Sequence, residues 1–167
     1  MEYYRITQKD NIRNTIMPKK VSASEIWEKD SPFFLPGTAD RPEEELVFLP
    51  FYEGSAFLIS DPVKTIWERY QMGGRYRPCA FGSVEQRKIV PYCFMAPKMI
   101  DCIHPDTEYH KNGDVRTLCL DGGIIGANRV FGVRTWHCIR LIIAEDVLEE
   151  MMREGITGYN WEKIPVH

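Results

Sequence analysis

Residues 136–161 read WHCIRLIIAEDVLEEMMREGITGYNW, and this stretch predicts the architecture of the last third of the chain. Residues 139–143 are almost continuously apolar and β-branched, which is typical of a strand covered on both faces. Glu145 and Asp146 follow, where acidic side chains favour the positive end of a starting helix. One apolar helical stripe comes next, formed by Val147, Leu148, Met151 and Met152.

A glycine and a returning segment complete this unit. Gly155 takes a left-handed backbone conformation without a Cβ penalty, so it suits the position after a helix. The apolar residues of 156–164 then predict a second strand. An earlier segment, at about 56–73, shows the same order of strand, acid, amphipathic helix and glycine. We therefore expect two strand–helix units, at about 56–73 and 139–155. An internal duplication and convergence on one common unit both explain the likeness.

The first of these units has a clear helical face. Ser60 is a capping residue ahead of Asp61-Pro62, and proline suits the first turn of a helix. Apolar residues then recur at i, i+3, i+4 and i+7: Val63, Ile66, Trp67 and Tyr70. We therefore expect Trp67 to lie in the core.

The remaining segments indicate short strands and turns. Residues 1–55 are the less regular part. We expect a strand at 3–7 and a brief capping-box helix at 22–29, which Ser31-Pro32 ends. A proline-rich loop follows, held to the core by Phe33, Phe34 and Leu35, and it leads into a strand at 46–49. The middle is β-rich: strands at 88–95, 99–103, 115–120 and 129–133, with a hairpin turn at 121–123. We predict a single α+β domain over 1–167, with a mostly antiparallel or mixed β-sheet.

Composition narrows the class of protein. The chain has 167 residues, 44% hydrophobic and 27% charged, with a net charge of −3, which argues against a broad nucleic-acid surface. No apolar run is long enough to span a membrane, and the first residues are polar, so we expect a cytoplasmic protein. The five cysteines include no CxxC pair, so we expect mostly buried free thiols in a reducing compartment: Cys79, Cys93, Cys102, Cys119 and Cys138.

No catalytic or metal motif stands out. Residues 101–110 gather two histidines and three acids, but their spacing matches no ligand motif, so a solvated loop is the simpler interpretation. His137 and Cys138 would point to opposite faces if they lay in a strand. The glycines at 122, 123 and 126 follow a strand, as in a phosphate-binding loop. No helix is expected after them, so no helix N-terminus would be available to bind an anion. We therefore predict no enzyme, no metal and no cofactor.

One basic segment supports an alternative. Residues 69–88 mix arginines with aromatic residues, a combination that binds RNA through phosphate contacts and base stacking. A second alternative is an unrecognised small enzyme, with the loop 101–110 folded over this segment to form a cleft. The tyrosines of 69–88 are also ordinary core or hairpin residues, so nucleic-acid binding is the less favoured interpretation.

Three segments resemble a known family: FLISDPVKTIWERY, VPYCFMAPKMIDCIHPDTEYH and RVFGVRTWHCIRLIIAEDVLEEMMREGITGYNWEKI. Their shared positions are Tyr92, Ile100-Asp101-Cys102, Phe131 and Gly155-Ile156-Thr157-Gly158-Tyr159. In this order they are similar to immunity proteins of bacterial polymorphic toxin systems, many of which are uncharacterised. The resemblance covers about 56–167, and residues 1–55 match less well.

The resemblance implies a non-enzymatic cytoplasmic protein that neutralises a cognate protein toxin by direct binding. Such an inhibitor needs shape and charge complementarity rather than catalytic residues. Many toxins that act on nucleic acids have basic grooves, so exposed carboxylates in turn-rich segments are candidate contacts. The predicted partner-binding residues are Glu43, Glu44, Glu45, Asp106 and Glu108; a merely solvated acidic face is the alternative.

Overall fold

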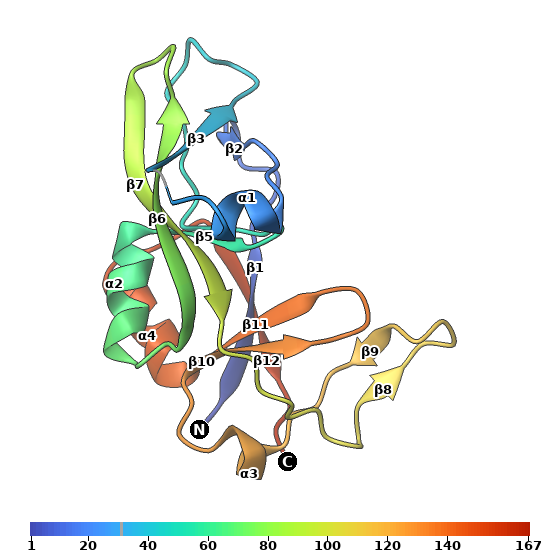
Figure 1. The fold of residues 1–167 in the computed structure, drawn as a ribbon. Helices are drawn as coiled ribbons and strands as arrows, with labels where there is room; N and C mark the ends of the chain where they lie inside the picture. Colours follow the sequence, from blue (N-terminus) through green and yellow to red (C-terminus); the bar gives the residue numbers. More distant parts are fainter. Residues whose placement is uncertain (31) are drawn as a thin grey trace.

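A computed structural model describes residues 1–30 and 32–167 as two larger sheets and a small two-stranded one, with the helices α2 and α4 packed against the larger two (Figure 1). The first sheet is four-stranded and antiparallel, in the order β10 (Val130–Arg134), β11 (Ile139–Ala144), β1 (Tyr3–Gln8) and β12 (Tyr159–Ile164). The N-terminal strand β1 therefore lies between two strands from the end of the chain. The strand–helix–strand unit expected around 139–164 is confirmed.

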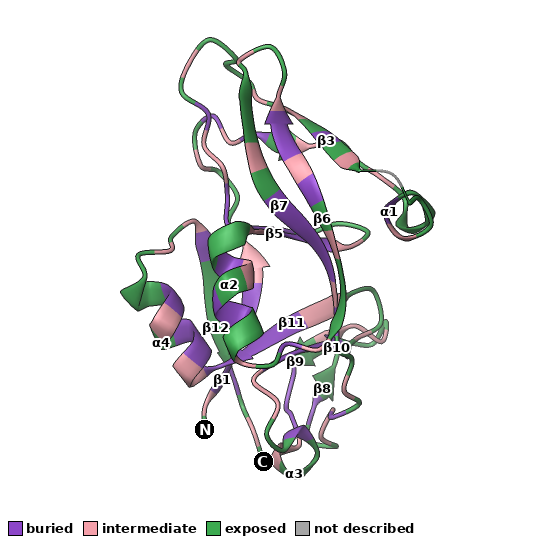
Figure 2. Ribbon diagram, turned by 60° about the vertical axis from the view of Figure 1, so that its left-hand side comes forward, coloured by how far each residue is buried: buried purple, intermediate pink, exposed green. Residues whose placement is uncertain are grey.

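The second sheet has six strands and a strong curl. Its order is β2 (Met17–Pro18), β3 (Phe33–Thr38), β6 (Gly74–Ser83), β7 (Lys88–Pro97), β5 (Phe57–Ser60) and β4 (Phe51–Tyr52). Only the β3–β6 pair among these is parallel, so the sheet is mixed. The long β6–β7 hairpin bends along its length and forms one wall of the molecule (Figure 2). The predicted α+β class with a mixed sheet is confirmed.

The helices of the described residues are short. They are α1 (Ala23–Trp27), α2 (Asp61–Arg69), α3 (Gly122–Ile125) and α4 (Glu145–Arg153). Ser22 caps α1 with the predicted capping box, while Ser31, expected to stop this helix, lies outside the described residues. No helix in residues 1–30 or 32–167 has the length and hydrophobicity to cross a bilayer.

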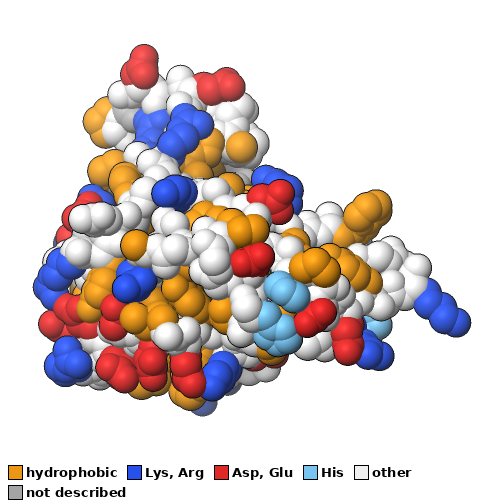
Figure 3. Space-filling model, turned by 90° about the horizontal axis from the view of Figure 1, so that it is seen from below, with side chains coloured by type: hydrophobic (Ala, Val, Ile, Leu, Met, Phe, Trp, Pro, Cys, Tyr) orange, Lys and Arg blue, Asp and Glu red, His pale blue; other side chains and the backbone are white. Residues whose placement is uncertain are grey.

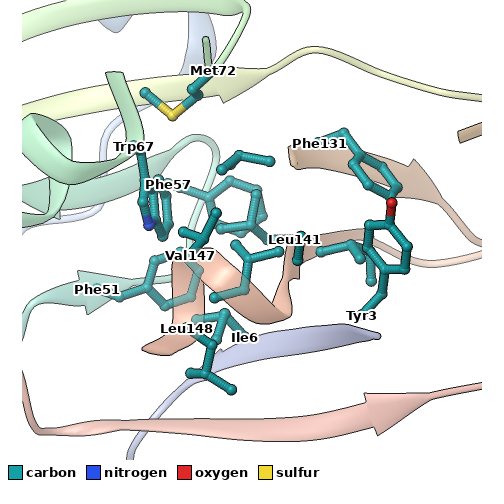
Figure 4. Close-up of a cluster of buried hydrophobic side chains, with 14 of the residues drawn as sticks. Tyr3, Ile6, Phe51, Phe57, Trp67, Met72, Phe131, Leu141, Val147 and Leu148 are labelled. Atoms are coloured by element: carbon teal, nitrogen blue, oxygen red, sulfur yellow. The ribbon is translucent and has the colours of Figure 1, made fainter. Parts of the chain in front are cut away.

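The main core lies where α2 and α4 meet the sheets (Figure 4). Trp67 of α2 is fully buried, and its indole Nε1–H points at Met151 Sδ of α4, 3.4 Å away. Val63 and Ile66 are buried beside it, as their spacing predicts. Met152, placed in the apolar stripe of α4 by sequence, is instead 47% exposed.

Several local predictions were wrong. Residues 33–38, expected in a loop, form β3, while 46–49 make only an isolated bridge at Val47. Residues 99–103 contribute isolated bridges at their two ends rather than a strand. The expected hairpin turn at 121–123 instead begins α3, because the Asp121 side chain accepts hydrogen bonds from the backbone N–H groups of Gly123 and Ile124.

The cysteines follow the expected pattern. All five are free, and only Cys138 is exposed. Burial raises the pKa of the Cys102 thiol to about 11 and that of Cys79 to about 12. These two thiols are therefore protonated and unreactive at neutral pH.

An acid-sensitive contact joins α2 to α4. Tyr70, just after α2, donates its hydroxyl hydrogen to Glu150 Oε2 at 2.6 Å, and Arg69 forms an ion pair with the same carboxylate. The Tyr70 hydrogen bond, aided by Arg69, holds the pKa of Glu150 below its usual 4.5, although partial burial opposes this shift. A carboxyl with a lowered pKa stabilises the fold above its unfolded-state pKa and loses that effect as pH falls.

We therefore expect Glu150→Gln to lower the unfolding midpoint at neutral pH, with a deficit that shrinks toward about pH 3. Urea unfolding of parent and variant at several pH values measures the difference. Glu149→Gln is the matched control, because Glu149 is an exposed carboxylate on the same helix. A Glu150→Gln deficit that is equally large at both ends of the pH range contradicts this assignment.

Candidate functional site

The most prominent surface feature is a projecting arm, which we define as residues 104–118. It contains the small hairpin of β8 (Glu108–Tyr109) and β9 (Val115–Thr117) and extends sideways from the four-stranded sheet (Figure 1). Gly113, with φ +93°, allows the tight turn at its end, and Asn112 Oδ1 accepts the Asp114 N–H at 3.0 Å. Asn112 and Gly113 therefore form the turn at the end of the arm.

A second turn lies beside the end of this arm. Residues 135–138 connect β10 to β11, and the backbone N–H of Thr135 donates to Cys138 O at 2.9 Å. His137 Nε2 lies 2.8 Å from Asp114 Oδ1, which ties this turn to the arm. His137 and Cys138 lie in this turn rather than in a strand, and His137 faces Asp114 rather than the thiol.

Exposed aromatic side chains lie on the arm and on the 135–138 turn. Trp136 is 71% exposed, the largest exposed fraction of any large hydrophobic residue in the part of the chain that the structure describes. Tyr109 on β8 is 55% exposed. Gly113 lies against the indole, since a Cβ placed there would be in van der Waals contact with Trp136 Cδ2, at 3.9 Å. Aromatic side chains that stand in water on a braced turn are well suited to bury area against another protein.

The predicted acidic contacts fall into two separate places. Glu108 lies on the arm and forms an ion pair with Arg116 of the facing strand, and Asp106 lies at the base of the arm. The segment 43–45 instead belongs to the loop between β3 and β4, at the other end of the molecule (Figure 1). Glu44 there pairs with Arg13 at 3.1 Å and Arg41 at 3.3 Å. The structure thus brings Asp106 and Glu108 together, but not with Glu43, Glu44 and Glu45.

The basic segment 69–88 runs from the end of α2 along β6, and several of its cations have intramolecular partners. Arg75 stacks over the Trp27 ring at 4.6 Å. Arg77 stacks over Phe33 at 5.4 Å and also donates to Ile26 O at 2.7 Å. These contacts tie α1 and β3 to β6, so a structural role explains these two arginines. Nucleic-acid binding through this segment stays a prediction.

A pocket of about 320 Å³ lies beside α1. Its wall is largely apolar and includes Ile26, Leu35 and Tyr52, with Lys19 and Lys20 also in the lining. The Tyr52 hydroxyl already donates to Ile16 O at 2.7 Å and accepts the Leu49 N–H at 3.0 Å, so it is not available for chemistry. The pocket does not contain any of the predicted contact residues.

The loop 101–110 makes hydrogen bonds to the segment around Cys119, and the enzyme alternative stays a prediction. The His104 N–H donates to Cys119 O at 2.9 Å, and Thr107 Oγ1 donates to the same carbonyl at 3.0 Å. His104, Cys119 and His167 have ligand atoms that all lie within 4.8 Å of one another. The sequence does not indicate this group, because its three members come from separate segments whose spacing matches no metal-binding motif.

In comparisons with known proteins, no protein-family model and no curated protein matches this chain.

Proposed function

We propose that this chain is a non-enzymatic immunity protein, which neutralises a cognate bacterial protein toxin by binding it through the arm and the 135–138 turn. The observation that carries the proposal is the exposed Trp136 on a turn braced by the His137–Asp114 contact. The five free cysteines suit the reducing cytoplasm, where such a toxin would be intercepted.

The arm has the physical features of a small, pre-organised contact surface. Tryptophan and tyrosine are enriched among the residues that dominate binding energies, and both are exposed here. Hydrogen bonds within the two turns hold their backbones before binding, so less conformational entropy is lost on association. Carboxylates flank the aromatics at Asp106, Glu108 and Asp114 and would steer a basic toxin groove toward the arm.

The test is co-expression with the toxin domain encoded next to this gene. We expect the parent protein to restore growth and to co-purify with the toxin. Glu108→Lys should weaken both, because it reverses a charge on the arm. Glu44→Lys tests the other predicted cluster: lost protection would extend the interface to residues 43–45, and full protection would restrict it to the arm.

Unfolding midpoints of both variants must match that of the parent for these results to report on binding. Absence of protection and of a complex with the parent overturns the immunity proposal. If the parent protects while Glu108→Lys and Trp136→Ala protect equally well, the interface lies elsewhere on the molecule.

A further inference from the structure

Two histidines and a cysteine converge at the base of the arm. The rings of His104 and His167 have centroids 5.1 Å apart, and the Cys119 thiol lies close enough to bring the three ligand atoms within 4.8 Å of one another. Cys119 is buried, whereas the two histidine side chains are 24% and 52% exposed. Histidine side chains lie together on the lower face beside acidic groups, so solvent reaches this place (Figure 3).

Backbone hydrogen bonds hold together the three segments that carry His104, Cys119 and His167. His104 N–H donates to Cys119 O at 2.9 Å, and His167 N–H donates to Leu120 O at 2.9 Å. Gly122 N–H donates in turn to His167 O at 2.8 Å. The Cys119 backbone is also fixed, because its N–H donates to Thr107 Oγ1 at 3.0 Å. All three side chains therefore project from backbone that the fold positions without a ligand.

The carboxylate of Asp106 lies next to the rings of both histidines. Asp106 Oδ2 lies 2.8 Å from His167 Nδ1 and 3.6 Å from His104 Nδ1. A carboxylate that accepts the Nδ1–H of a histidine leaves the Nε2 lone pair free, and this arrangement is common behind metal-bound histidines. For His104 the Nδ1 atom at present accepts the Asp106 N–H at 3.1 Å. Ligation through Nε2 would exchange that hydrogen bond for one from Nδ1–H to the Asp106 carboxylate.

We propose that His104, Cys119 and His167 bind one divalent metal ion of the zinc type, with Asp106 orienting the histidines and water in the fourth position. Two imidazoles and a thiolate form a borderline-to-soft donor set, which favours Zn²⁺ over Mg²⁺ or Ca²⁺. Zinc bonds of about 2.0–2.3 Å place tetrahedral ligand atoms about 3.3–3.6 Å apart, so the side chains close in by roughly 1 Å. The metal displaces the thiol proton, which leaves to solvent as the metal–sulfur bond forms.

This ion would fasten the arm to the end of the chain. His104 begins the arm, while His167 follows β12, so a shared metal crosslinks two segments that are distant in sequence. Binding to the folded state alone raises stability in proportion to the logarithm of metal concentration. The inference departs from the sequence-based expectation of no metal, and it does not depend on the proposed toxin partner.

The experiment uses tag-free protein, freed of metal by a chelator and then dialysed. Titration with Zn²⁺ against a chromophoric chelator should give one site per chain, and Zn²⁺ should raise the thermal unfolding midpoint. Titration with Co²⁺ should produce a thiolate-to-cobalt charge-transfer band in the near ultraviolet, together with the intense visible bands of a four-coordinate ion. That spectrum reports the thiolate directly.

Variants separate this site from adventitious binding. His167→Gln changes an exposed side chain and should weaken zinc binding by more than about 100-fold, while Asp106→Asn should cost about 10–100-fold, as outer-shell changes do. Cys119→Ser should abolish the charge-transfer band. His110→Gln and Cys138→Ser are the matched controls, because both residues are exposed and outside the group.

Three results would overturn the proposal: no stoichiometric zinc at micromolar concentration, a cobalt complex without the thiolate band, or equal losses in the control variants. If Cys119→Ser fails to fold, His167→Gln and the cobalt spectrum of the parent still decide the question.

Discussion

Trp67→Ala is expected to lower the free energy of unfolding by about 3–5 kcal/mol, the usual range for a deleted core aromatic. Trp67 is fully buried on α2, its ring centroid lies 6.4 Å from that of Phe51, and its indole N–H meets Met151 Sδ. Removing it leaves a cavity between α2 and α4, the helices of the two strand–helix units. Chemical unfolding followed by circular dichroism measures the change without relying on tryptophan emission.

Trp161→Ala is the control for this experiment. Trp161 lies on β12, is half exposed and makes an edge-to-face contact with Tyr4 at 5.9 Å. Its loss should cost about 0.5–1.5 kcal/mol, the range of a single aromatic pair. If the Trp67→Ala midpoint barely moves, the packing of α2 against α4 is incorrect.

The helices α1, α2 and α4, but not α3, could be predicted from the sequence because their signals are local. In α2, the spacing of Val63, Ile66 and Trp67 places all three on one face, and all three are buried. In α4, acids open the helix and Gly155, at φ +75°, follows its end. Periodicity and end signals of this kind depend on few neighbours, so tertiary contacts rarely override them.

The strand β3 could not be predicted, because its support is non-local. Pro36 and Gly37 in this segment normally indicate a loop. In the fold, Phe33 pairs in parallel register with Cys79, about 45 residues along the chain, a pairing that no local pattern indicates. Gly37 is needed for close packing, because a Cβ there would lie 2.6 Å from Ile16 Cγ1.

The candidate binding surfaces also combine features that local sequence predicts with features that depend on distant segments. Turn-rich segments predicted that Asp106 and Glu108 would be exposed, and they are. No sequence pattern indicated the exposure of Trp136, because it depends on where the 135–138 turn lies relative to the arm. The convergence of His104, Cys119 and His167 likewise follows from backbone pairing between distant segments.

Trp136→Ala is expected to weaken toxin binding by about 2 kcal/mol or more, which is about 30-fold in Kd. The indole is 71% exposed in the free protein, so burying it against a partner removes a large apolar area from water. The turn that carries it is already held by the Thr135–Cys138 hydrogen bonds and the His137–Asp114 contact. Little further ordering is needed on binding, and most of the burial energy contributes to affinity.

Isothermal titration of the purified toxin domain into parent and variant measures this effect. Trp161→Ala is again the matched control, because Trp161 is an exposed tryptophan on β12, at the opposite edge of the sheet from β10. We expect it to retain parental affinity, and we expect Tyr109→Ala to show a smaller loss than Trp136→Ala because a smaller fraction of Tyr109 is exposed. An unchanged Kd for Trp136→Ala, with the parent binding tightly, excludes the arm as the toxin-facing surface, and a loss for Trp161→Ala moves the interface to the β12 edge.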